Sequence, residues 1–165
     1  MHIPSYVYVL LFVLAYIGIK RGFPSTVKLQ RLFFTPLFFI MLSLRGVTTL
    51  FDMGRIEILL WLAGGFIGFL LGTQHVRTAI IKADHNHQLI RLPGDWSMLV
   101  LILSIFLFEF FIHYSIESHL AYSSNMIFVN SSISIFGLIA GLSIGRTWVY
   151  FNKYKTTQSE PLSET

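Results

Sequence analysis

The chain has 165 residues, of which 54% are hydrophobic, 16% are aromatic and only 12% are charged, and its mean hydropathy is +0.67. Soluble domains carry about 25% charged residues, so this composition excludes a water-soluble globular protein. Cysteine is absent, which excludes disulfides, thiolate metal sites and cysteine nucleophiles. The net charge is +4, but the basic residues stand at the ends of apolar runs, where they indicate membrane topology, so we expect no nucleic-acid partner.

Five apolar runs are long enough to cross a membrane, since a spanning helix needs about 17 to 25 mainly apolar residues. They cover residues 3–19, 33–51, 56–72, 96–114 and 127–145. The first run could be a secretory signal, but it has no basic start and Lys20 and Arg21 follow its apolar stretch. We therefore interpret it as a retained span. In the second run, Thr35 and Pro36 are suited to the cap and first turn of a helix.

The positions of lysine and arginine predict the orientation. Ten of them lie near or after the ends of the first, third and fifth runs, whereas the other connectors carry only Arg55. The positive-inside rule then places the N-terminus outside and the C-terminus in the cytoplasm. We predict an all-α, five-span bundle over residues 1–155 with the lipid bilayer around it, and a disordered cytoplasmic tail over residues 156–165.

Two runs carry glycine at every fourth position. These glycines are Gly64, Gly68 and Gly72 in the third run and Gly137, Gly141 and Gly145 in the fifth. Lipid gives no hydrophobic drive for helix association, so small residues that let backbones approach usually form the contact. The two stripes either pack on each other or each receive a different neighbour, and a glycine-lined passage is the alternative role.

Two ionisable residues lie within apolar runs, Arg45 in the second and Glu109 in the fourth. Each would cost about 2.5 to 3.5 kcal/mol at the bilayer centre. They lie 12 and 13 residues from the starts of their runs, so at about 1.5 Å per residue they reach the same depth. We therefore predict that these two helices are neighbours and that the two side chains form an ion pair.

Other polar residues fall in the same layer, namely His113, Asn130 and Ser134. Together with the charged pair they could form an intramembrane site for a solute or a proton. In the other interpretation the pair is purely structural. A local alternative has the carboxylate bonding His113 while the guanidinium extends toward Asp52.

The segment His85-Asn86-His87, with His75 and Asp84 nearby, has residue types common in metal sites but no specific spacing. We interpret it as a solvated turn and expect no metal and no cofactor. The serines lack a histidine and an acid at a recognisable spacing. The sequence therefore predicts no catalytic residue and no enzyme activity.

Two segments carry a family resemblance. They are Leu92-Pro93-Gly94-Asp95-Trp96, which precedes an apolar run containing Ile105-Phe106, and Phe136-Gly137-Leu138-Ile139-Ala140-Gly141, which is followed by Arg146. They resemble a family of small bacterial inner-membrane proteins of unknown function, which has Leu-Pro-Gly-Ser-Trp before a helix that contains a lysine. Here Asp95 replaces the serine and Glu109 stands where the lysine is expected. Aspartate, like serine, can cap the following helix.

The resemblance implies a multi-pass protein of the bacterial inner membrane and conveys no activity. Our first hypothesis is a non-enzymatic accessory or assembly protein that works through helix contacts, as a homo-oligomer or in a larger membrane complex. The alternative is a small-solute or ion transporter that uses Arg45 and Glu109.

Overall fold

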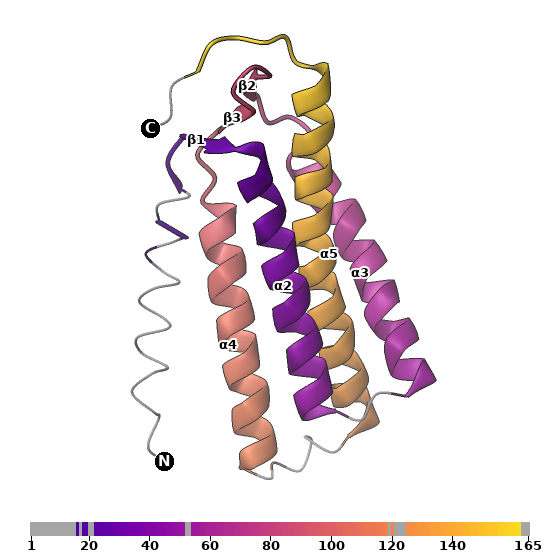
Figure 1. Ribbon diagram of the computed structural model, residues 1–165. Coiled ribbons are helices and arrows are strands. Elements are labelled where there is room, and N and C mark those ends of the chain that lie inside the picture. The colour runs from indigo at the N-terminus through magenta and orange to yellow at the C-terminus, as the bar shows by residue number, and fades with distance from the viewer. Residues whose placement is uncertain are drawn as a thin grey trace.

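The computed structural model describes residues 16, 18–19, 22–51, 54–118, 120 and 125–162. In this part of the chain, four helices form a bundle and a small sheet covers one end (Figure 1). The helices are α2 (Leu29–Leu50), α3 (Arg55–His75), α4 (Ser97–Glu117) and α5 (Met126–Thr156). Each is long and apolar enough to cross a membrane, which fits a multi-pass membrane protein. They correspond to four of the five predicted runs, and the first run, residues 3–19, lies outside the described residues except at its end.

The sheet is a feature that the sequence analysis does not predict. Its strands β1 (Ser25–Lys28), β2 (Lys82–Asp84) and β3 (Leu89–Leu92) are antiparallel in the order β1-β3-β2. Ser25 pairs with Leu92, and Lys82 pairs with Arg91. Strands of three or four residues are too short to show a period-two pattern against the strong helical signal. The bundle is therefore helical as predicted, with a sheet at the end where α2 begins and α5 ends (Figure 1).

Helix α2 begins earlier than predicted. It starts directly after β1, where the Leu29 amide donates to the Gln88 carbonyl at 2.9 Å, so Pro36 lies inside the helix and not in its first turn. A proline this near the N-terminal end removes one backbone hydrogen bond. The pairing of β1 with β3 fixes the start of α2, and this contact is not visible in the local sequence.

Helix α5 extends beyond the length that a membrane requires. Its 31 residues reach about 46 Å, whereas the hydrocarbon layer is about 30 Å thick. Its last turns pack against the sheet in a buried cluster that joins Tyr150 and Tyr154 to Leu32, Ile90 and Leu92. The excess length of α5 therefore supports the sheet.

The structure describes the segment after α5 as far as Leu162, and this part of the predicted disordered tail lies along β2. Ser159 forms a parallel bridge with Ala83, and the Glu160 amide donates to the Ala83 carbonyl at 2.9 Å. The Leu162 amide donates to a carboxylate oxygen of Asp84 at 3.1 Å. The tail is polar, as the sequence indicates, but β2 offers it backbone partners.

The glycine stripes of α3 and α5 face each other. A Cβ atom built on Gly64 would lie 2.1 Å from the Ser134 carbonyl oxygen, and one on Gly141 would lie 1.9 Å from the Gly65 carbonyl oxygen. Close approaches of 2.0 to 2.4 Å to backbone carbonyl oxygens also occur at the other four glycines, Gly68, Gly72, Gly137 and Gly145. Of the two arrangements considered above, the stripes pack on each other, and the two parallel backbones come closer than any larger residue would allow.

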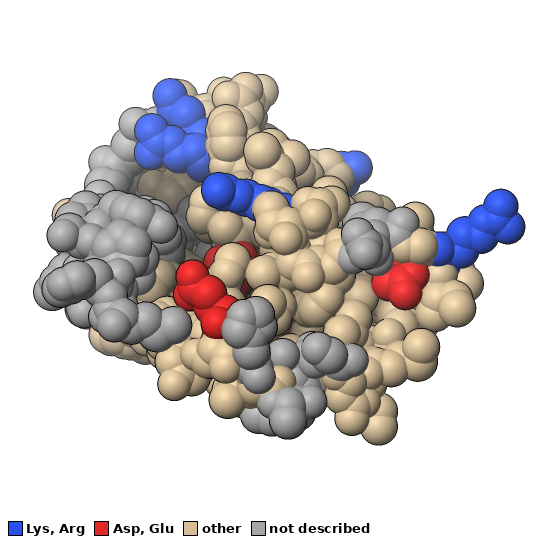
Figure 2. Space-filling view, turned by 90° about the horizontal axis from the view of Figure 1, so that it is seen from below, with Lys and Arg blue, Asp and Glu red and all other residues tan. Residues whose placement is uncertain are grey.

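The opposite end of the bundle is seen in Figure 2, where a few acidic and basic side chains lie on a mostly uncharged surface. Most of the described lysines and arginines instead belong to the sheet, its connectors and the adjoining helix ends. They are Lys28, Arg31, Arg77, Lys82, Arg91, Arg146, Lys153 and Lys155.

Candidate functional site at the sheet end

The most buried charge pair of the described residues lies where α4 begins beside α5. Arg146 of α5 is 8% exposed, and its Nη2 donates to the carboxylate of Asp95. Its Nη1 donates to the Ser97 hydroxyl at 2.7 Å. Because a buried guanidinium without a partner is strongly destabilising, this pair fixes the start of α4 to the side of α5.

Asp95 reaches this place through the turn between β3 and α4. A Cβ atom on Gly94 would lie 2.2 Å from the Gly22 carbonyl oxygen, so the turn passes too close to another backbone for a larger residue. One Asp95 oxygen accepts the Ser97 amide at 2.9 Å, and the other accepts from Arg146. The N-cap of α4 is Trp96 and not the predicted Asp95, but the Asp95 carboxylate accepts the first amide of α4 and also pairs with α5.

The surroundings of Asp95 favour its charged form. Burial by itself would raise the pKa of this carboxyl group, but the Ser97 hydrogen bonds and the positive charges of Arg146 and His75 hold the pKa below its ordinary value. The pair is thus ionised at neutral pH.

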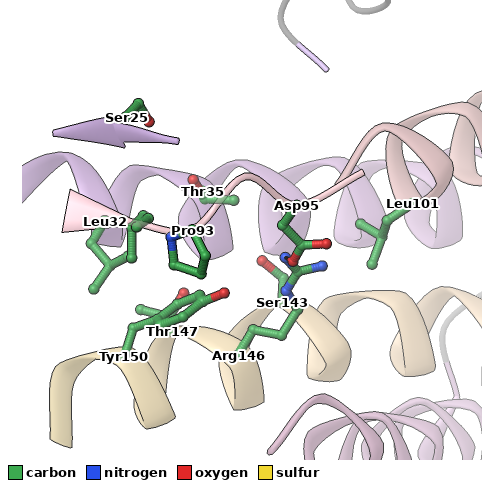
Figure 3. Close-up of a pocket in the computed structure, with 11 residues that line it drawn as sticks. Ser25, Leu32, Thr35, Pro93, Asp95, Leu101, Ser143, Arg146, Thr147 and Tyr150 are labelled. Atoms are coloured by element: carbon green, nitrogen blue, oxygen red, sulfur yellow. Dashed lines mark hydrogen bonds and ion pairs between the residues drawn. The ribbon is translucent and has the colours of Figure 1, made fainter. Parts of the chain in front are cut away.

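A small cavity of about 40 Å³, lined by both polar and apolar residues, adjoins this pair. Figure 3 shows Arg146 pointing from α5 toward Asp95, with Ser143 and Thr147 on the same helix and Pro93 across the cavity. Within the described part of the chain, the Ser143 hydroxyl is buried and has no hydrogen-bond partner. A water molecule needs about 10 to 15 Å³, so this cavity can hold water that bonds Ser143.

A larger groove of about 430 Å³ lies between α4 and α5 and is also lined by Arg146. Its walls are mostly apolar, formed by Val100, Leu101 and Phe108 of α4 and by Ile135, Leu138, Ile139 and Leu142 of α5. Ser97, Arg146 and His75 of α3 form its polar end. The groove therefore combines a long apolar wall with a cationic end.

The predicted pair of Arg45 and Glu109 is only partly assembled. Glu109 is half-buried, and its Oε1 lies 3.4 Å from the position of a Cβ atom on Gly46, so α2 and α4 are neighbours at this level. Arg45 interacts with the carboxylate electrostatically. Among the described contacts, however, the two side chains form neither an ion pair nor a hydrogen bond with each other, because Arg45 is directed to the exposed side of α2.

The other members of the predicted layer are dispersed. His113 is exposed, and the Ser134 hydroxyl donates to the Asn130 carbonyl of its own helix at 2.9 Å. Neither the 40 Å³ cavity nor the 430 Å³ groove is lined by any of the five predicted residues. The small cavity lies instead at the sheet end, beside Asp95 and Arg146.

The histidine segment forms the turn between β2 and β3. Asp84 is buried there and accepts the amides of Asn86 and His87 at 2.9 and 3.2 Å, and the His87 ring nitrogen Nδ1 lies 2.9 Å from its second oxygen. The hydrogen bond with the His87 side chain and the bond from the Leu162 amide lower the pKa of Asp84 to about 2, against the opposing effect of burial. The described residues contain no group of three or more metal-binding side chains placed for an ion.

Comparison with known proteins identifies a family. The model of a family of unknown function, DUF6622, matches residues 1–157. The chain belongs to this family. No curated protein and no solved structure matches it. Membership of DUF6622 agrees with the resemblance to a family of unknown function but supplies no activity, so the function of this DUF6622 member has to be argued from its geometry.

Three polar contacts in this DUF6622 protein escape sequence reasoning. The first is the pair of Asp95 and Arg146, for which the aspartate in place of the expected serine was the available signal. The second is Ser43, which accepts the Trp61 indole N–H at 2.8 Å and donates to the Phe136 carbonyl at 2.8 Å, joining α2, α3 and α5. These contacts link residues far apart in the chain, and local patterns do not reveal them.

The third contact is made by Lys153, near the end of α5. Its ammonium group donates to the carbonyls of Val76, Arg77 and Ala79, directly after the last turn of α3. Cations are stabilising at a helix C-terminus, where carbonyl groups lack partners. Lys153 of α5 therefore provides hydrogen-bond donors for the carbonyl groups that follow the C-terminal end of α3.

Proposed function

We propose that the protein is a non-enzymatic accessory protein of the bacterial inner membrane that binds an apolar partner along the groove between α4 and α5. One observation carries this proposal: the groove of about 430 Å³ is open along two helices, mostly apolar, and ends at a buried arginine. Its volume falls in the range of about 300 to 1,000 Å³ that is typical of ligand sites. Binding without turnover fits the groove wall, because the side chains of Val100, Leu138 and Leu142 are hydrocarbon and cannot act as acid, base or nucleophile.

We infer the orientation from charge. The sheet end, where the described lysines and arginines gather, faces the cytoplasm, and Arg55 marks the outer side. Residues 3–19 supply a fifth span that begins outside. The protein acts as a homo-oligomer or within a larger membrane complex through the same apolar surfaces.

The test is photo-crosslinking in intact membranes. A photoreactive amino acid is placed at Ser104, which lines the groove, and in a control at Phe34, which is 67% exposed on α2 and does not line the groove. We expect a discrete adduct from position 104 that position 34 does not give. Identical diffuse labelling from both positions would show that the groove holds no specific partner.

Transport is the second candidate, and one observation favours it. The half-buried Glu109 lies beside Gly46 and interacts electrostatically with Arg45, so a titratable group is held between α2 and α4. Proteoliposomes loaded with a pH-sensitive dye would then show proton flux that Glu109→Gln abolishes. Equal flux in wild type, Glu109→Gln and empty liposomes would exclude this route.

A further inference from the structure

We propose that the partner in the α4–α5 groove is an anionic phospholipid, with one acyl chain along the groove and the phosphate at the end formed by His75, Ser97 and Arg146. This inference rests on the proposed function and names the chemistry of its partner. Three features of the groove support it: its length, its polar end and its place relative to the surrounding charges.

The length of the groove matches one leaflet. On α4 the lining extends from Ser97 to Phe108, and on α5 it extends from Arg146 back to Ile135, which is a separation of eleven residue positions in each case. At about 1.5 Å per residue both walls are about 16 Å long, which is about half of the 30 Å hydrocarbon layer. An acyl chain of one leaflet fits this length, whereas a partner helix would cross the whole layer.

The polar end of the groove suits a phosphate. Arg146 has five N–H donors, of which the described hydrogen bonds to Ser97 and Asp95 use two. Guanidinium groups bind phosphate oxygens with good geometry. The imidazole of His75 is exposed beside the groove and near enough to act on the Asp95 carboxylate. The pair of Arg146 and Asp95 is neutral as a unit, and the imidazole of His75 places a further nitrogen at the same end of the groove.

The charges around this end favour an anionic headgroup over a zwitterionic one. The lysines and arginines of the sheet end surround the same membrane surface, and Arg77 follows His75 by two residues and is exposed. Basic residues at the membrane surface attract anionic lipid headgroups. The lipid would therefore come from the leaflet on the side of the sheet.

The inference is tested with the full chain in nanodiscs that contain equal parts of phosphatidylglycerol and phosphatidylcholine, followed by extraction into mild detergent and native mass spectrometry. We expect retained phosphatidylglycerol in preference to phosphatidylcholine. Ser104→Trp, which fills the groove, should lower the retained lipid about tenfold. The matched control Leu107→Trp, on a 61% exposed position outside the groove lining, should retain it. His75→Ala should lower the preference for phosphatidylglycerol while total retained lipid changes little.

Equal retention by Ser104→Trp and wild type, or equal retention of the two lipids, would overturn the inference. Circular dichroism spectra and melting of both tryptophan variants establish that lipid loss does not follow from unfolding. The crosslinking at Ser104 separates this inference from the proposed function. A lipid adduct supports both, a protein adduct supports the accessory role and overturns the lipid, and no specific adduct overturns both.

Discussion

The packing of α3 on α5 makes a sharp prediction, because two adjacent glycines differ in what an added methyl group would meet. A Cβ atom on Gly64 would lie 2.1 Å from the Ser134 carbonyl oxygen, whereas one on Gly65 would lie 3.6 Å from the Gly137 carbonyl oxygen, an ordinary contact. We expect Gly64→Ala to destabilise the bundle and Gly65→Ala to leave it nearly unchanged.

The magnitude follows from the geometry. The distance at Gly64 is about 1.3 Å short of an ordinary contact of 3.4 Å, and the opposing atom is backbone, so one of the two helices must move. Overpacking costs about 1 to 3 kcal/mol, and the movement would also loosen the close approaches at Gly68 and Gly141. Alanine is the better helix former by up to about 1 kcal/mol, so we expect Gly64→Ala to lower the free energy of unfolding by about 2 kcal/mol and Gly65→Ala to change it by less than about 1 kcal/mol.

The assay is reversible unfolding in detergent micelles by titration with sodium dodecyl sulfate, followed by far-ultraviolet circular dichroism. Gly68→Ala, whose Cβ atom would lie 2.0 Å from the Leu138 carbonyl oxygen, should repeat the loss seen at Gly64. If Gly64→Ala and Gly65→Ala unfold at the same detergent fraction, the stripes do not form the contact and the reasoning is refuted.

Further predictions concern the sheet end. Asp95→Asn should lower the free energy of unfolding by about 3 kcal/mol, since it leaves a buried guanidinium without its carboxylate partner. The double variant Asp95→Asn with Arg146→Met should recover part of this loss in the same titration. Additive losses from the two substitutions would contradict the pairing. The folded-state pKa of Asp84 is lowered to about 2, so its stabilisation of the C-terminal segment is fully present above the unfolded value of about 3.9 and is lost as the pH falls toward about 2. The exchange protection factor of the Leu162 amide should fall over that range and become independent of pH in Asp84→Asn, and a pH-dependent variant would exclude Asp84 as the cause. Lys153→Met should cost about 1 to 3 kcal/mol and increase amide exchange at the C-terminal end of α3, and unchanged exchange there would show that the lysine is dispensable.

The described helices follow from the sequence because about twenty consecutive apolar residues have few alternatives to a spanning helix. The predicted starts of the third, fourth and fifth runs lie within one residue of α3, α4 and α5. The start of α2 differs by four residues, because a strand pairing precedes it. The glycine spacing also indicates the contact between α3 and α5, since glycine at every fourth position of a membrane helix usually marks a face where another helix packs closely.

The depth argument for Arg45 and Glu109 gave the neighbouring helices but not the side-chain contact. Residue counts along a helix fix the height of a side chain, and they do not fix the direction in which it points around the axis. Arg45 is on the exposed side of α2 while Glu109 is half-buried against Gly46. The two side chains therefore interact electrostatically but do not form an ion pair, because they lie at different positions around their helix axes.

The sequence by itself determined the apolar helices, the absence of cysteine chemistry and the glycine faces, because these depend on composition and on spacing within one helix. Only the tertiary structure decided that Asp95 pairs with Arg146, that Lys153 closes α3 and that residues 157–162 lie along β2. Each of these contacts joins residues more than fifty positions apart. Such partners are selected by which surfaces meet after the helices pack, and that choice is a property of the assembled fold, not of any local segment.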